Sequence, residues 1–116
     1  MDTIRKNIAF VKYDTDPALS DNDPKFRLMI LNLTNDTQNS FDFTLEYTAQ
    51  IGHLVFSPNG NKVAMEVGYG PKNERGEIYI FDIPSQKLTR QVTENKHLKI
   101  DGWKNENEVT WSEWKI

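Results

Sequence analysis

LVFSPNGNKVAMEVGYGPKNERGEIYIFDI, residues 54–83, is the most informative stretch of this 116-residue chain. It contains three apolar segments, separated first by the short run Ser57–Asn61 and then by the longer polar run Gly68–Gly76. Pro58 suits an early turn position because its φ angle is fixed, and Gly60 allows the positive φ that many turns need. The stretch therefore predicts three strands, with a tight turn between the first two and a long loop before the third.

Similar apolar or alternating segments continue on both sides of this stretch. Phe41–Tyr47 alternates strictly between apolar and polar residues, which is typical of a strand with one buried and one exposed face. The polar run Thr34–Asn39 before it is expected to be a turn. No segment has a helical period, so we predict an all-β, antiparallel fold. The nine expected strands cover residues 8–13, 26–33, 41–47, 53–56, 62–67, 77–83, 88–93, 98–103 and 109–116.

Composition excludes several classes of function. The length fits one domain, residues 1–116. The net charge of −3 provides no broad basic surface, so we expect no nucleic-acid partner. Cysteine is absent, which excludes disulfides and thiolate chemistry. No apolar run approaches the roughly 20 residues that cross a bilayer, so we expect no membrane insertion. The compartment stays open: cytoplasmic if these residues are the whole protein, extracytoplasmic if they belong to a longer exported one.

Three pairs of segments resemble one another. The pairs are IAFVKY at 8–13 with VAMEVG at 63–68, LMILNL at 28–33 with IYIFDI at 78–83, and GWKNENEVTW at 102–111 with VFSPNGNKVAM at 55–65. In the second pair the polar residues Asn32 and Asp82 occupy the same place. The spacing of about 46 to 55 residues is close to the four-strand unit of propeller repeats. We therefore expect repeat units at roughly 1–50 and 51–96 and a partial unit at 97–116.

The segments FSPNGNKVAM, GEIYIFDIPSQKLTRQVT and GWKNENEVTW resemble the TolB-like, or more broadly WD-repeat-like, β-propeller repeat. The residues that match the family pattern are Phe56, Ser57, Pro58, Gly60, Asp82 and Thr89, with Asn59 in place of the usual Asp. The resemblance implies propeller-blade-like sheets of four antiparallel strands. The repeat also occurs in the non-catalytic propellers of prolyl-oligopeptidase-like peptidases, so the resemblance implies no active site.

The number of strands is too small for a closed propeller. Nine strands make about two blades, whereas propellers have at least four. Three explanations fit this number: the sheets pack together within one chain, several copies assemble into a ring, or the chain is a fragment of a longer protein. We expect about two blades packed together, no closed ring within one chain, and self-association as the main alternative.

An acidic loop is the main metal candidate in the sequence. Carboxylates at alternating positions suit Ca²⁺, which prefers oxygen ligands. The EF-hand pattern is absent, however, so a solvated loop is the favoured interpretation and we expect no cofactor. The candidate ligands are Asp14, Asp16, Asp21 and Asp23.

The two histidines, His53 and His97, each come next to an apolar strand in what look like matching repeat positions. Repeat equivalence explains them, and a metal pair or a general base is a weaker alternative because no positioned partner is evident. Ser57 lies in Phe-Ser-Pro rather than in a nucleophile elbow, so we expect a turn residue.

A contact patch is expected near the long loop, because loops on a rigid β scaffold often carry binding residues. Trp111 and Trp114 are three residues apart and should face opposite sides of a strand, one in the core and the other exposed. The expected contact residues are Tyr69, Lys72, Arg75 and Trp114.

No catalytic pattern stands out, so the first functional hypothesis is a non-enzymatic binding or interaction module with a protein or peptide partner. One alternative is an accessory piece of a larger propeller-bearing hydrolase. Another is a carbohydrate- or cell-wall-binding domain that uses exposed tryptophan and tyrosine.

Overall fold

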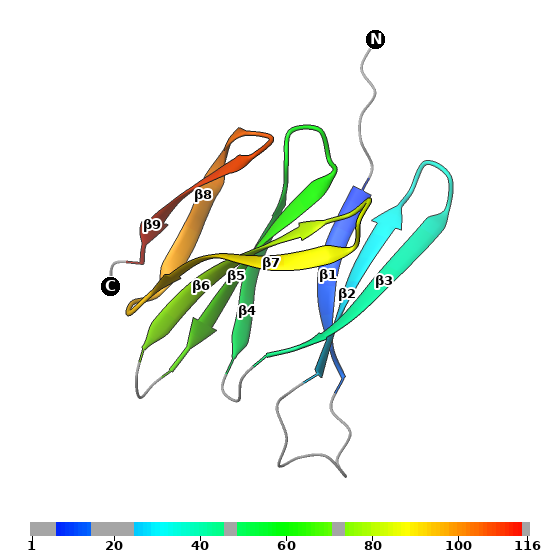
Figure 1. Cartoon of the computed structure of the whole chain (residues 1–116). Coiled ribbons are helices and arrows are strands. Elements are labelled where there is room, and N and C mark those ends of the chain that lie inside the picture. The colour runs from blue at the N-terminus through cyan, green and yellow to red at the C-terminus, as the bar shows by residue number, and fades with distance from the viewer. Residues whose placement is uncertain (1–6, 15–24, 46–48, 71–73, 115–116) are drawn as a thin grey trace. The chain divides into compact units, whose positions relative to one another are not determined.

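The structure is a computed structural model that describes residues 7–14, 25–45, 49–70 and 74–114. These residues form nine antiparallel strands in open sheets of three, four and two strands, and no helix (Figure 1). This confirms the predicted all-β, antiparallel fold class with no closed ring. The strands are β1 (Asn7–Asp14), β2 (Lys25–Asn32), β3 (Thr37–Thr44), β4 (Gln50–Phe56), β5 (Lys62–Tyr69), β6 (Arg75–Asp82), β7 (Lys87–Glu94), β8 (Leu98–Asn105) and β9 (Glu108–Glu113).

The chain divides into two compact units, Met1–Tyr47 and Thr48–Ile116, near the boundary expected between the first two repeats. The first unit contains the sheet β1-β2-β3, and the second contains the sheet β4-β5-β6-β7 and the hairpin β8-β9. In both larger sheets, strands that are neighbours in the sequence are neighbours in space. Assignment of the whole chain to one domain stays a prediction.

The two larger sheets contain the same turn at the same place. Asn32 ends β2 and Asp82 ends β6, and each side chain accepts backbone N–H groups of the turn that follows. Each turn then places a residue other than glycine at positive φ, Asp36 at 57° and Gln86 at 56°. Both turns thus combine a side-chain acceptor at the end of the strand with a left-handed residue at the end of the turn. The turns between β2 and β3 and between β6 and β7 are therefore built alike, although the β6-β7 pairing contains a register shift between Ile78 and Tyr79 that β2-β3 lacks.

The expected boundaries of β3 were wrong. The predicted turn at 34–39 is confined to residues 33–36, and the strand begins at Thr37 rather than at Phe41. Pairing runs without interruption from Asn32↔Thr37 to Lys25↔Thr44. The polar residues that suggested a turn lie on the exposed outer strand of the sheet, so their polarity reflects solvent exposure and not a bend.

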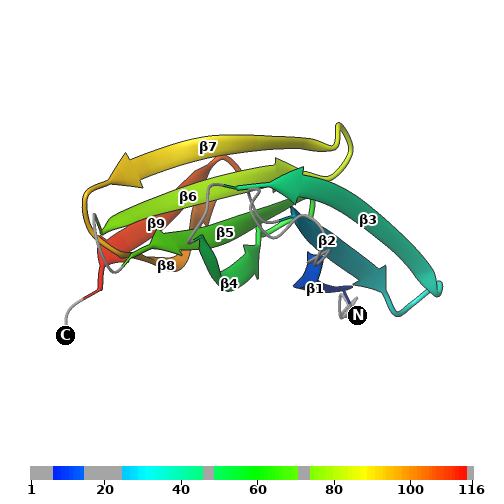
Figure 2. The same ribbon diagram turned by 90° about the horizontal axis from the view of Figure 1, so that it is seen from below.

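In the second unit, the hairpin β8-β9 packs through β8 on one face of the four-stranded sheet, across β4, β5 and β6 (Figures 1 and 2). Ala64 and Ile78 from the sheet and Leu98 and Ile100 from β8 form a buried apolar cluster between them. Trp103 packs at its edge, and its indole N–H donates a hydrogen bond of 3.0 Å to the carbonyl of Val55. The apolar side chains on this face of the four-stranded sheet are thus buried against the apolar side chains of β8.

The expectation that Trp111 or Trp114 lies in the core was wrong. Their exposed fractions are 37% and 49%, and Trp103 is the tryptophan that packs on the core cluster. β9 is the outer strand of a two-stranded sheet, and all its residues except Val109 are exposed.

Ser57 is a turn residue, as its sequence context predicted. Its hydroxyl accepts the backbone N–H of Lys62 at 3.0 Å and donates a hydrogen bond of 2.6 Å to the carboxylate of Glu106. The other oxygen of Glu106 accepts the backbone N–H of Asn59 at 2.8 Å. The turn after β4 is therefore tied to the turn after β8, which fixes one end of the hairpin on the sheet.

Candidate functional site

A cleft of about 680 Å³ lies in the second unit, where β4 and β5 meet the beginning of β8 and the residue that follows β9. Within the described structure its walls combine aromatic, imidazole and carboxylate side chains with glycine backbone. The lining residues are Gln50, Ile51, Gly52, His53, Glu66, Gly68, Tyr69, Gly70, Glu74, His97, Leu98 and Trp114.

One wall of the cleft is built from backbone contacts around His97. The Nε2 atom of His97 lies 3.0 Å from the carbonyl oxygen of Tyr69, and the carbonyl of His97 accepts the backbone N–H of Trp114 at 2.9 Å. A Cβ atom at Gly68 or Gly70 would lie 3.8 or 3.6 Å from the His97 ring. The imidazole therefore packs against the bare backbone at the end of β5, and the backbone carbonyl of His97 holds Trp114 beside it.

The opposite wall carries a β-bulge. Ile51 pairs with Val67 and Leu54 with Met65, so Gly52 and His53 together face one residue of β5, Glu66. A bulge bends its strand and re-aims side chains. The Nδ1 atom of His53 lies 3.4 Å from Glu66 Oε2, and the imidazole itself is mostly exposed.

The two histidines line one cleft, but they do not occupy equivalent positions. His53 lies inside β4 and in its bulge, whereas His97 precedes β8. The matching positions expected from sequence were wrong, because His53 is the fourth residue of β4 whereas His97 lies one residue before β8 begins. The described residues contain no group of three or more His, Asp or Glu side chains placed to hold a metal ion. Asp14 ends β1, and Asp16, Asp21 and Asp23 lie outside the described residues, so the calcium candidate stays a prediction.

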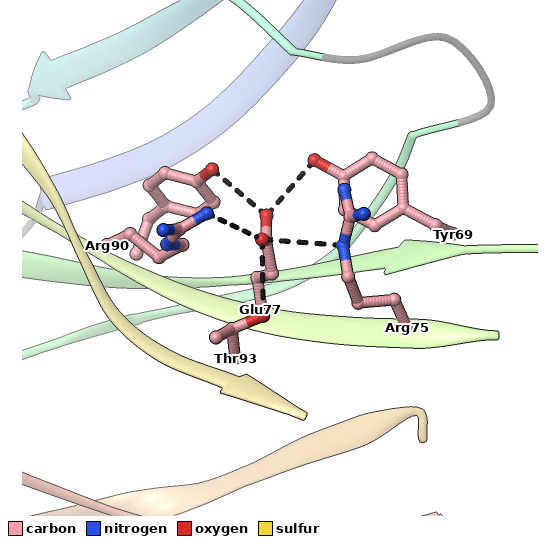
Figure 3. Close-up of polar contacts among 6 residues, drawn as sticks. Tyr69, Arg75, Glu77, Arg90 and Thr93 are labelled. Carbon is pink, nitrogen blue, oxygen red and sulfur yellow. Dashed lines mark hydrogen bonds and ion pairs between the residues drawn. The ribbon is translucent and has the colours of Figure 1, made fainter. Parts of the chain in front are cut away.

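Beside the cleft, Glu77 of β6 carries a buried carboxylate with an exposed fraction of 1% (Figure 3). Its Oε1 atom accepts hydrogen bonds from the hydroxyls of Tyr69, at 3.1 Å, and Tyr79, at 3.0 Å. A buried charge is tolerated when hydrogen bonds and opposite charges replace its hydration. The hydroxyls of Tyr69 and Tyr79 replace part of the hydration that the Glu77 carboxylate loses on burial.

The second oxygen, Oε2 of Glu77, faces two cations. Arg90 Nη1 lies 3.1 Å away and Arg75 Nε lies 3.5 Å away, and the hydroxyl of Thr93 donates at 3.4 Å (Figure 3). Arg75 also places its guanidinium 4.1 Å from the centroid of the Tyr69 ring, within the range of a cation–π contact. One carboxylate thus joins β5, β6 and β7.

Burial raises the pKa of the Tyr69 hydroxyl above its usual value, and the nearby Glu77 charge adds to the effect. Burial also raises the pKa of Tyr79, together with its hydrogen bond to Glu77. Because the folded pKa lies above the unfolded one, the native state holds each phenolic proton more tightly. This stabilisation is complete below the unfolded pKa of about 10 and is lost as the pH rises through the folded value.

We therefore expect the free energy of unfolding to fall as the pH rises above about 10. Tyr79→Phe removes one of the phenolic protons, so its stability should decline less steeply with pH, from a lower starting value at neutral pH. Urea unfolding followed at a series of pH values measures both slopes. Parallel slopes for Tyr79→Phe and the parent protein would contradict the assignment of this pH dependence to the phenol.

The structure does not gather the three described contact residues, Tyr69, Arg75 and Trp114, at one exposed surface. The Tyr69 side chain is buried in the Glu77 cluster, with Arg75 stacked on it, and Trp114 lies half exposed at the cleft. Lys72 lies outside the described residues. Their role in binding stays a prediction.

Sequence reasoning missed Glu66 and Glu77, although a signal was present. Each is a single carboxylate within an otherwise apolar strand, in VAMEV and GEIYIF. A charge in a strand that is covered on both faces needs partners, so such a residue predicts a buried polar cluster or a site.

Within the described residues no helix is long and apolar enough to cross a membrane. No protein-family model matches the chain, and comparison with curated proteins and with solved structures finds no significant relative.

Proposed function

We propose that this protein is a non-enzymatic binding module that holds a segment of a protein or peptide partner in the cleft between β4-β5 and β8. The observation that carries the proposal is the cleft itself, about 680 Å³, with Trp114 at its mouth and polar groups along its walls. Binding sites are commonly concave and combine apolar or aromatic surface with a few directed polar groups.

The scaffold of this module is, in our proposal, a pair of TolB-like blades with a third one begun. The repeated turn after β2 and β6 supports it, as do sheets of consecutive antiparallel strands. In such a scaffold the strands are rigid and the residues at their ends bind. Self-association into a ring is the alternative, which solution mass by light scattering tests.

Trp114→Ala should weaken the binding of peptides selected on this protein by about tenfold or more, because large aromatic side chains dominate contact energy. The peptides come from a displayed library of random sequences panned against the whole chain, and calorimetry measures their affinity. Trp111→Ala is the matched control, since this exposed tryptophan does not line the cleft. Equal losses in both variants, or failure to select any peptide, would refute the proposal.

A carbohydrate ligand is the second candidate, because a half-exposed tryptophan at a cleft can stack on a sugar ring. The same two tryptophan variants separate the candidates. Quenching of tryptophan fluorescence by a panel of oligosaccharides, lost in Trp114→Ala and kept in Trp111→Ala, would favour the sugar. Peptide selection without such quenching favours the protein partner.

A further inference from the structure

Glu66 presents a buried carboxylate to the cleft, and only one of its two oxygens is used. The side chain is 7% exposed. Its Oε2 atom accepts the backbone N–H of Ile100 at 2.9 Å and lies 3.4 Å from His53 Nδ1. Among the described residues no donor reaches Oε1. Within the described structure Oε1 is not shielded from solvent, so it is open to the cleft and can accept a hydrogen bond from a cation or an N–H group of a ligand.

The bulge in β4 is what leaves this oxygen open. Gly52 faces Glu66, and a Cβ atom built on Gly52 would lie 2.6 Å from Oε1. Any residue with a side chain would therefore occupy the space in front of the oxygen. Gly52 and Glu66 both line the cleft, so a ligand group that enters it can approach Oε1.

The charges around the cleft favour the binding of a positively charged ligand group. Within the described residues the lining contains two carboxylates, Glu66 and Glu74, and neither lysine nor arginine. Of the nearby cations, Lys96 is paired with Glu113 at 2.7 Å. Lys99 lies 5.7 Å from the centroid of the Trp114 ring, within the range of a cation–π contact, and it does not line the cleft.

We propose that the cleft selects a cationic group of its ligand, an ammonium or a guanidinium, and binds it at Glu66 Oε1 beside Gly52. This inference rests on the proposed function and adds the ligand chemistry. The cation replaces the missing donor and neutralises the buried charge, and charge-assisted hydrogen bonds are the strong ones. An ammonium comes from a lysine side chain or from the amino terminus of a peptide, and a guanidinium comes from arginine.

Short capped peptides test the selection directly. The probes are acetyl-Gly-Lys-Gly-amide, the arginine and norleucine analogues, and Gly-Gly-Gly-amide with a free amino terminus. NMR titration follows the backbone amides of Gly52, Glu66 and Ile100. We expect shifts with the lysine and arginine probes, and binding at least about tenfold weaker for norleucine, which keeps the chain and lacks the charge. Binding of Gly-Gly-Gly-amide as strong as that of the capped lysine peptide identifies the amino terminus as the source of the cation.

Two variants test the named atoms. Glu66→Gln should lose at least about tenfold in affinity for the lysine probe. Gly52→Ala should do the same by crowding Oε1. Glu108→Gln is the matched control, because Glu108 is an exposed carboxylate that does not line the cleft, and it should change affinity little. Circular dichroism confirms that each variant is folded, and loss of fold in one leaves the other as the test.

Failure of this inference and failure of the proposed function give different results. If library peptides bind in a Trp114-dependent way but norleucine replaces lysine without loss, the cleft binds peptides and selects no cation. If the probes shift no cleft amide up to their solubility limit, cation selection at Glu66 is refuted. If neither probes nor library peptides bind, both proposals fall.

Discussion

Replacing Glu77 with alanine should lower the free energy of unfolding by about 3 kcal/mol. The carboxylate is 1% exposed and joins three strands through two arginines, two tyrosines and a threonine. Removing it leaves Arg75 and Arg90 facing each other without the charge that both contact, and it leaves two phenolic donors without this acceptor. Because total stabilities of small domains are about 5–15 kcal/mol, this loss is a large fraction of the whole.

Thermal and urea unfolding measure this effect, and we expect Tm to fall by about 10 °C. Glu74→Ala is the matched control, because Glu74 is an exposed carboxylate that just precedes the same strand. Glu77→Gln separates charge from packing, since it keeps the volume and removes the charge. Equal stability of the Glu77 and Glu74 variants would contradict the account of Glu77 as the centre of the cluster. Full stability of Glu77→Gln would assign the effect to volume alone.

Gly76→Ala should destabilise the second unit by about 3 kcal/mol, at the upper end of the usual cost of overpacking. A Cβ atom at Gly76 would lie 2.3 Å from the carbonyl oxygen of Lys96 and 2.8 Å from the backbone nitrogen of Leu98. These are backbone atoms at the start of β8, which cannot rotate away as a side chain can. The hairpin β8-β9 would have to move off the sheet, and the buried cluster around Ile78 would be disturbed.

Gly68→Ala provides a closely matched control for this prediction. Gly68 pairs directly with Gly76 across β5 and β6, and a Cβ atom there would meet only the His97 ring at 3.8 Å, an ordinary contact. Alanine at this position should therefore leave the stability unchanged or raise it slightly, because it restricts the unfolded chain. Urea unfolding of both variants checks the difference. Equal effects at the two positions would mean that β8 does not approach β6 as closely as the structure shows.

The strand pattern could be predicted from the sequence because it depends on local alternation and on turn residues. Residues 53–67 were expected to contain two strands around a Pro-Asn-Gly turn, and the structure has β4 and β5 there. The error at β3 arose because Thr37–Ser40 are polar, and a polar outer strand has the same composition as a turn. Composition distinguishes exposure from burial better than it distinguishes strand from turn.

The cleft could not be predicted because it depends on a shift of register. The predicted strand began only at His53, and nothing in Ile51-Gly52-His53-Leu54 shows that two of these residues face Glu66 alone. The buried carboxylates were visible as isolated acidic residues in apolar strands, but their partners come from other strands. Which partners meet is a property of tertiary packing and not of local sequence.

The matching turns after β2 and β6 also show how little such a turn depends on the identity of its own residues. Leu33-Thr-Asn-Asp36 and Ile83-Pro-Ser-Gln86 share no residue type at any corresponding position, yet each ends in a residue with almost the same left-handed φ. What the two turns share lies just before them, a side chain at the strand end, Asn32 or Asp82, that accepts a backbone N–H of the turn. Substitutions inside either turn should therefore be tolerated better than loss of that acceptor.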